Sequence, residues 1–346
     1  MSLREELGEQ PVVAARLLGE GRRHIATVAA ELRSRPIDFV VIAARGTSDH
    51  AAIYAQYVLG IRHRLPVALA TPSTISIYGV APRFERTLVL GISQSGASPD
   101  VVGVVAAARA QGAPTVAITN TPDSPLATAA EHVIELQAGP ERAVAATKTY
   151  GAELLSLALL SQALAETADP ADEAALQGLP AVLEAALAGE PAVEEAARRQ
   201  AAMEACVVLG RGYDYATARE WSLKLKELAY VAAEPYSAAD FEHGPLAIVQ
   251  PGFPVLAVAA GRAADGLEPL LRRLQDELAA ELLVISDRPA LAALGPLGLP
   301  IPGGLPDWLL PIVAIVPAQL HAYHLTRLKG LDPELPRHLQ KVTRTH

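Results

Sequence analysis

The stretch ACVVLGRGYDYATAREWSLKL (residues 205–225) repeats the pattern of an earlier stretch, VVIAARGTSDHAAIYAQYV (residues 40–58). Each begins with a continuous aliphatic run, passes through Arg-Gly and a polar turn, and continues with helical spacing of its apolar residues. Gly46 and Gly212 are 212 − 46 = 166 positions apart. A buried strand that leads into a helix is typical of a parallel sheet with helices on both faces. The repeat therefore predicts two copies of one doubly wound α/β unit in tandem.

Further strand and helix signals extend this pattern along the chain. Strand-like runs lie at 39–44, 67–71, 87–92, 115–119, 132–136, 254–260 and 282–287, and after Gly244-Pro245. Helices are expected at about 148–165 and, as an Ala- and Glu-rich connector, at about 169–191. The predicted organisation is an N-terminal helical segment (1–30), a first domain (31–175), a second domain (176–330) and a C-terminal tail (331–346).

The composition excludes several classes of protein. Lys and Arg number 29 and Asp and Glu 38, a net charge of −9 without a basic block, which disfavours binding to nucleic acid or to an anionic membrane. The single cysteine, Cys206, excludes an internal disulfide and a Cys-based metal cluster. The N-terminus lacks the apolar core of a signal peptide, and no run reaches the roughly 20 apolar residues of a membrane span. We therefore expect a cytoplasmic protein.

The turn SQSGAS (Ser93–Ser98) is the best candidate for a phosphate site. It lies between a buried strand and a helix, where open α/β sheets bind ligands. Its serine hydroxyls and the Gln94 amide could surround an anion at the helix N-terminus. The turn has no Lys and no GxxxxGK[ST] motif, which favours a small phosphate monoester over a nucleotide triphosphate. The alternative is an ordinary turn in which Ser98 caps the helix.

A second polar turn, GTSDH (Gly46–His50), has the same strand–turn–helix context. Thr47 and Ser48 could complete the phosphate site or contact sugar hydroxyls, although helix capping explains them equally well. The corresponding turn of the second half, VAAGRAADG, has no hydroxyl. The second half must therefore contribute something other than phosphate binding.

The helix that carries EWSLKLKE is the candidate for acid–base chemistry. At about 100° per residue, Glu220, Lys224 and Glu227 form one polar stripe with apolar residues on both sides. Burial of such a group is costly unless the charges are paired or functional. Glu227 would then be the proton-transfer base, and Lys224 would stabilise negative charge on the intermediate. The alternative is a surface set of i, i+4 ion pairs.

Histidines supply one further candidate. His243 precedes Gly-Pro and could act as an acid–base group near neutral pH, although a lone histidine is more often structural. His321 and His324 form an i, i+3 pair without a third ligand nearby, so no metal site is predicted. Composition alone describes the C-terminal LPRHLQKVTRTH, which contains Lys341, as a solvated tail.

Taken in order, these motifs resemble one known family, the isomerase half of glutamine–fructose-6-phosphate amidotransferase, which has two sugar-isomerase domains. The resemblance rests on RGTSDHAA, SQSGASPD, AITNTPDSPLA, VAATKTY, the block from GRGYDYATAREWSLKLKELAY to FEHGPLAIV, and GLDPELPRHLQKVT. It covers almost the whole chain and includes the opening EQP at residues 9–11.

The resemblance implies a role for each matching residue. Its phosphate site corresponds to Ser93, Gln94, Ser95 and Ser98, with Thr47 and Ser48 close by. Its C1–C2 proton-transfer base corresponds to Glu227, its charge-stabilising lysine to Lys224, and a further site-lining carboxylate to Glu220. Its ring-opening histidine, contributed by the neighbouring subunit of a homodimer, corresponds to His243. Its tail lysine, which contacts the open-chain sugar and is a candidate for a Schiff base, corresponds to Lys341.

Three departures from the family pattern shape the functional prediction. No glutaminase domain with an N-terminal Cys nucleophile precedes the two domains in this sequence, so we expect no synthesis from glutamine. Ala146 replaces a usual serine and Arg45 a usually small residue, and both changes bear on sugar contacts. We therefore expect a homodimeric deaminase that converts glucosamine-6-phosphate to fructose-6-phosphate and ammonia without a cofactor or metal. The alternatives are a fructosamine-6-phosphate deglycase and a non-catalytic sugar-phosphate-binding regulatory module.

Overall fold

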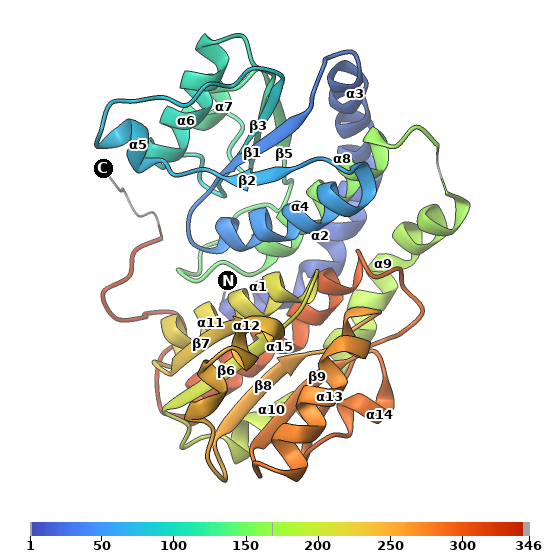
Figure 1. The fold of residues 1–346 in the computed structure, drawn as a ribbon, viewed down its shortest axis with the longest axis vertical. Helices are drawn as coiled ribbons and strands as arrows, with labels where there is room; N and C mark the ends of the chain where they lie inside the picture. Colours follow the sequence, from blue (N-terminus) through green and yellow to red (C-terminus); the bar gives the residue numbers. More distant parts are fainter. Residues whose placement is uncertain (1, 168, 342–346) are drawn as a thin grey trace. The chain divides into compact units, whose positions relative to one another are not determined.

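The computed structural model describes residues 2–167 and 169–341, which form two compact units. The N-terminal unit contains residues 12–141, 148–177 and 340–341. The C-terminal unit contains residues 2–11, 142–147 and 178–339. Each unit is built on its own five-stranded parallel sheet (Figure 1).

The sheet of the N-terminal unit has the strand order β2-β1-β3-β4-β5. Its strands are β1 (Phe39–Ala43), β2 (Val67–Leu69), β3 (Thr87–Ile92), β4 (Thr115–Thr119) and β5 (His132–Glu135). The central strands β3 and β4 are buried along their whole length, because helices cover both faces of the sheet. The strand order reverses direction between β1 and β3, and doubly wound sheets bind ligands at this point.

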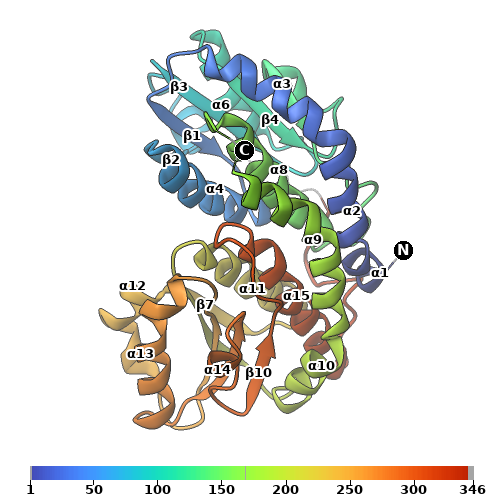
Figure 2. The ribbon, with the colours of Figure 1, turned by 90° about the vertical axis from the view of Figure 1, so that its right-hand side faces the viewer.

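Helices form a layer on each face of this sheet (Figure 2). One layer contains α3 (Arg22–Arg33), α4 (Thr47–His63) and α8 (Lys148–Leu164), preceded by α2 (Gln10–Arg16) and a π-helical turn at Leu17–Gly21. The other contains α5 (Ser73–Ser76), α6 (Pro99–Ala110) and α7 (Pro125–Ala129). Helix α8 is apolar on nearly all sides and is accordingly buried, which confirms the helix expected at about 148–165.

The sheet of the C-terminal unit has the order β10-β9-β8-β6-β7, which is the order of the first sheet read from its other edge. Its strands are β6 (Ala205–Gly210), β7 (Ala232–Ser237), β8 (Pro254–Val258), β9 (Glu281–Ser286) and β10 (Leu297–Pro300). Gly46 and Gly212 also share a positive φ of 57° and 58°, at the start of equivalent turns. The tandem doubly wound fold predicted from the repeat is therefore confirmed.

The helices of this unit again lie in two layers (Figures 1 and 2). One holds α1 (Leu3–Gly8), α10 (Glu190–Arg199), α11 (Asp214–Leu228) and α15 (Leu310–Leu328), and the other α12 (Ala238–Glu242), α13 (Ala263–Asp276) and α14 (Pro289–Ala292).

The connector expected at 169–191 is helical, as α9 (Pro170–Ala188). The expected strand after Gly244-Pro245 is wrong: Pro245–Ile248 is a 3₁₀-helix, because this half-exposed run has no partner strand. Within the described residues, every helix is too short or too polar to cross a bilayer.

The histidine pair of α15 serves the interior of the C-terminal unit. Trp221 Nε1 donates to His321 Nδ1 at 3.2 Å, and His321 Nε2 lies 3.0 Å from Gln200 Oε1. This arrangement holds the neutral ring with its proton on Nε2. Burial, together with a smaller effect of the nearby His324, lowers the pKa of His321 to about 3. In the described residues no group of three His, Cys, Asp or Glu side chains could hold a metal.

Buried His321 should make the fold sensitive to acid. Below pH 6.5, the ordinary pKa of histidine, His321 is protonated in the unfolded chain but stays neutral in the folded protein. The free energy of unfolding should therefore fall as the pH drops from 6.5 towards 3. The slope from this one group is at most about 1.4 kcal/mol per pH unit. In chemical denaturation between pH 4 and 7, His321→Asn should flatten the pH dependence, whereas the exposed control His338→Asn should not. An unchanged slope in His321→Asn would contradict the assignment.

Candidate functional site

The serine turn follows β3 directly and leads into α6, at the edge where the strand order reverses. Ser93 Oγ accepts from the N–H of Gly96 at 3.1 Å, and Ser95 Oγ from that of Ala97 at 3.3 Å. Ser98 occupies the N-cap position of α6, but its side chain makes no capping hydrogen bond. The capping alternative therefore does not account for the Ser98 hydroxyl.

Gly96 gives this turn its shape. Its φ is +61°, and an added Cβ would lie 2.0 Å from Ser124 Oγ, the side chain that caps α7. The carbonyl of Gly96 also accepts from Leu126 N at 3.0 Å. The turn after β3 is thus packed directly against the turn after β4, and only glycine fits between them.

Gly96→Ala should consequently destabilise the protein by about 3 kcal/mol, because backbone strain and a steric clash add together. Gly112→Ala is the matched control: its φ is +80°, but nothing lies within 4 Å of the added Cβ. The control should cost only about 1 kcal/mol. Urea unfolding measures both changes in the free energy of unfolding. Equal changes for the two variants would show that the clash with Ser124 does not contribute to the destabilisation.

The backbone N–H groups of the equivalent turns differ between the two units in their hydrogen-bond partners. In the N-terminal unit, the backbone N–H groups of Gln94, Ser95 and Ser98 donate to no residue that the structure describes. In the equivalent turn of the C-terminal unit, three successive N–H groups are occupied by carboxyl groups of the chain. They are Ala260 N to Asp214 at 2.8 Å, Gly261 N to Asp287 at 3.0 Å, and Arg262 N to Asp307 at 3.3 Å. Carboxyl groups of the chain thus occupy the anion-binding N–H groups of the second turn, whereas those of the first turn have no such partner among the described residues.

Asp214 also occupies the position in the second repeat that Ser48 has in the first, since 48 + 166 = 214. Burial raises the pKa of Asp214 well above its ordinary value, although the hydrogen bond from Ala260 opposes this. In the N-terminal unit Ser48 Oγ donates to the buried carboxylate of Glu153 at 2.7 Å. The only proton of the Ser48 hydroxyl is used in that bond, so this hydroxyl has no second proton to donate. Thr47, the first residue of α4, is half-buried.

Arg45, which departs from the family pattern, reaches the first turn of α6. Its Nε donates to Asp100 Oδ2 at 2.7 Å, and its Nη2 lies 2.6 Å from the same oxygen. The Asp100 side chain is 3% exposed and that of Arg45 46%. A positive charge therefore lies beside a turn whose own residues carry none.

The acid–base candidates come together on α11 in the C-terminal unit. Lys224 Nζ lies 2.6 Å from Glu227 Oε2 and 3.3 Å from Glu220 Oε1. Glu220 is fully buried and Lys224 is 1% exposed, whereas Glu227 is 22% exposed. Burial alone would lower the pKa of Lys224, but attraction by the two carboxylates and the hydrogen bonds that they accept outweigh it and raise that pKa. Lys224 is therefore a permanent cation, and Glu227 is the member of the group that solvent can reach.

His243 is not part of this ion-paired group. It follows α12 on an exposed stretch of the C-terminal unit. Among the described residues its side chain has no hydrogen-bond or ion-pair partner. The structure thus brings three of the acid–base candidates together but leaves this one unengaged within its own chain.

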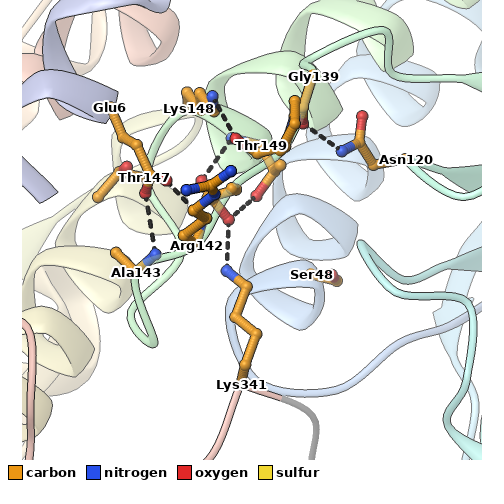
Figure 3. Close-up of polar contacts among 12 residues, drawn as sticks. Glu6, Ser48, Asn120, Gly139, Arg142, Ala143, Thr147, Lys148, Thr149 and Lys341 are labelled. Atoms are coloured by element: carbon orange, nitrogen blue, oxygen red, sulfur yellow. Dashed lines mark hydrogen bonds and ion pairs between the residues drawn. The ribbon is translucent and has the colours of Figure 1, made fainter. Parts of the chain in front are cut away.

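Lys341 is held by a carboxylate of the N-terminal unit. Its Nζ donates to Glu141 Oε2 at 2.8 Å, and the Glu141 side chain is fully buried. Glu141 also accepts from the backbone N and the Oγ1 of Thr149, at 3.1 and 2.7 Å, in the first turn of α8. Figure 3 shows Lys341 extended towards this start of α8. Composition alone described Lys341 as solvated, but it is 25% exposed and paired; residues 342–346 of the tail lie outside the described residues.

The loop that carries Glu141 is itself anchored on both sides (Figure 3). Asn120 Nδ2 donates to the carbonyl of Gly139 at 2.8 Å, and buried Lys148 donates to that of Pro140 at 2.8 Å. Sequence reasoning missed Asp100, Glu141 and Glu153. Asp100 is the last residue of the motif SQSGASPD, and Glu141 lies three residues before VAATKTY, but only their partners in space reveal their roles.

Comparison with known proteins agrees with this architecture. The SIS domain family matches residues 36–163 and 204–326. A glutamine–fructose-6-phosphate aminotransferase (isomerizing) from Pyrococcus horikoshii is 34% identical over 310 residues, which are 88% of this chain and 51% of that protein. The chain thus spans about half the length of the curated relatives it matches.

Two solved structures are similar over nearly their whole length. A candidate phosphosugar isomerase from Silicibacter pomeroyi is 36% identical, with a TM-score of 0.85 and coverage of 95% of this chain and 98% of that one. The C-terminal domain of glucosamine-fructose-6-phosphate aminotransferase from Francisella tularensis is 26% identical, with a TM-score of 0.85 and coverage of 96% and 97%. The chain therefore belongs to the SIS domain family, with two SIS domains in tandem that correspond to the isomerase half of these aminotransferases.

Proposed function

We propose that this protein is a sugar-phosphate isomerase that acts as a deaminase, converting glucosamine-6-phosphate to fructose-6-phosphate and ammonia. The observation that carries the proposal is the ion-paired group on α11, in which buried Lys224 contacts both Glu220 and the partly exposed Glu227. A buried charge cluster with one accessible carboxylate is costly to maintain for stability alone and suits proton transfer. A module that only binds sugar phosphates needs the phosphate site but not this cluster.

The relatives support the substrate class. The aminotransferases matched by this chain act, by their names, on fructose-6-phosphate, and the similar Silicibacter pomeroyi structure is described as a candidate phosphosugar isomerase. The open N–H groups and hydroxyls of the serine turn would bind the 6-phosphate. Lys341, held by Glu141, would contact the open-chain sugar.

The residues divide the reaction into balanced steps. His243, contributed by the second subunit of a homodimer, would help to open the sugar ring. Glu227 would remove the proton from C2 while the C1 oxygen takes up a proton, which gives an enolamine. Return of the proton to C1, with loss of one proton from the amine nitrogen, gives a ketimine. The Lys224 ammonium would stabilise the negative charge that develops during this transfer, and Glu220 would hold Lys224 in place. Water then hydrolyses the ketimine, releasing ammonia and fructose-6-phosphate.

One assay tests this proposal against its closest competitor. Ammonia and ketose phosphate are measured together over a panel of 2-amino-sugar phosphates and fructosamine-6-phosphates. Equimolar ammonia and fructose-6-phosphate from glucosamine-6-phosphate is the expected result. Release of an amino acid from a fructosamine-6-phosphate, without ammonia from glucosamine-6-phosphate, would instead identify a deglycase. Binding without turnover of any substrate would identify a regulatory module.

A further inference from the structure

The turn after β1 and the first turn of α6 meet at the reversal point of the N-terminal sheet. Strands β1 and β3 are parallel neighbours, with Ala43 opposite Gly91, so the residues that follow them emerge at the same edge. Arg45 follows β1, and Asp100 is the second residue of α6. Their ion pair therefore joins the two segments that the proposed phosphate site uses.

The position of Asp100 poses an electrostatic problem for anion binding. Its carboxylate is buried at the N-terminus of α6, where Oδ1 accepts from Val101 N at 2.9 Å. A helix N-terminus favours one negative charge, and a buried carboxylate there would repel a phosphate that approaches the same turn. The adjoining serine turn contains no Lys or Arg that could compensate. Arg45 is the cation that the structure places against this carboxylate.

Arg45 has donors left after this pairing. Its guanidinium contacts Asp100 through Nε and Nη2, and a guanidinium carries five N–H donors in a rigid fork. With 46% of its side chain exposed, Arg45 can pair with Asp100 and still offer N–H groups to a ligand. Arginine suits this double role because its planar fork can satisfy two acceptors at once.

The second half of the chain provides an internal comparison. The offset of 166 that relates Gly46 to Gly212 places Gly266 at the position of Asp100, and Asp265 lies one residue before it. Asp265 is 68% exposed and pairs with Arg288 rather than with the arginine that precedes Gly212. In that half the turn N–H groups are already filled by carboxyl groups. The ion pair between arginine and aspartate therefore occurs in the half whose turn N–H groups are not occupied by carboxyl groups of the chain.

We propose that Arg45 is a ligand of the substrate phosphate, held in position by Asp100, and that it makes this site selective for a dianionic phosphate monoester. This inference rests on the proposed function for the location of the phosphate site, and it deepens that function by adding a charged ligand. Asp100 is a positioning residue that acts through Arg45.

The test measures binding rather than turnover. Isothermal titration calorimetry gives dissociation constants for fructose-6-phosphate and for unphosphorylated fructose with the intact chain. Arg45→Ala should raise the constant for fructose-6-phosphate about tenfold to a hundredfold, because a charge-assisted contact is lost and Asp100 is left uncompensated. Arg45→Lys should recover only part of this loss, since lysine cannot serve both acceptors in a planar fork. Asp100→Asn should raise the dissociation constant for fructose-6-phosphate by a smaller factor than Arg45→Ala does.

The double variant Arg45→Ala/Asp100→Asn decides whether Arg45 contacts the phosphate itself. It removes the uncompensated carboxylate, so it also guards against misfolding of the single variant. We expect it to bind fructose-6-phosphate at least fivefold more weakly than the native protein. Recovery to within twofold would overturn the proposal, because Arg45 would then only neutralise Asp100. Unchanged binding in Arg45→Ala would overturn it as well. If native protein and variants behave as expected but no ammonia is released from glucosamine-6-phosphate, the proposed function fails and the inference about Arg45 stands.

Discussion

Glu227→Gln is expected to lower the kcat for ammonia release from glucosamine-6-phosphate by about 10²- to 10⁴-fold, the usual contribution of a general base. The amide cannot accept the C2 proton. It keeps the size of the carboxylate and can still accept the hydrogen bond that Lys224 donates at 2.6 Å. Binding of fructose-6-phosphate should therefore change by less than about threefold. Steady-state kinetics and calorimetry on the same preparation separate the two effects.

A matched control for this variant is Glu234→Gln on β7, because Glu234 is an exposed glutamate of the same unit. It makes the same chemical change outside the α11 cluster and should leave kcat within a factor of two. If Glu227→Gln retained more than a tenth of the native kcat, Glu227 would not be the base. Equal loss of binding and turnover would instead point to a structural role.

Lys224→Met should destabilise the protein by about 3–5 kcal/mol and abolish turnover. Glu220 is fully buried and would lose the cation that compensates it, and removal of one partner from a buried ion pair carries a penalty of this size. Methionine fills nearly the same volume, so the loss reports charge rather than a cavity. Urea or thermal unfolding measures the change in stability.

Arg198→Met on α10 is a close control for Lys224→Met. Arg198 also pairs with two glutamates of its own helix, Glu194 and Glu195, each at 2.8 Å, but its side chain is 54% exposed. This surface pairing should contribute less than about 1 kcal/mol to the free energy of unfolding. The double variant Glu220→Met/Lys224→Met should recover most of the stability without recovering activity, because the uncompensated charge is then removed. A loss for Lys224→Met no larger than for Arg198→Met would contradict the buried-charge argument.

Much of the fold follows from local pattern. The strands β3 and β4 lie where their aliphatic runs predict, because a strand buried on both faces must be apolar throughout. Helix α8 is equally predictable from the sequence, since it is buried and apolar on nearly all sides. The tandem architecture followed from the Arg-Gly repeat, and both sheets have the same strand order.

The edge strands of the second sheet were not predictable in this way. Strand β7 (Ala232–Ser237) has the sequence AAEPYS, with a proline and a glutamate and no aliphatic run. It forms because it lies at the edge of the sheet and pairs with β6 on one side only, where proline and an exposed charge are tolerated. Conversely, the apolar run after Pro245 forms a 3₁₀-helix because no strand is available to pair with it.

The sequence by itself determined the tandem doubly wound fold through its repeat. It also determined the serine turn after β3 and the polar stripe of α11, because each of these depends on residues within one turn or one helix. Tertiary structure alone decided which charges meet: Arg45 with Asp100, Lys341 with Glu141, and three aspartates with the second turn. These partners are separated by 26 to 200 residues in the sequence. Periodicity carries no information over such distances. A buried charge must nevertheless find a partner when the chain folds, so packing, rather than local sequence, sets the electrostatics of the site.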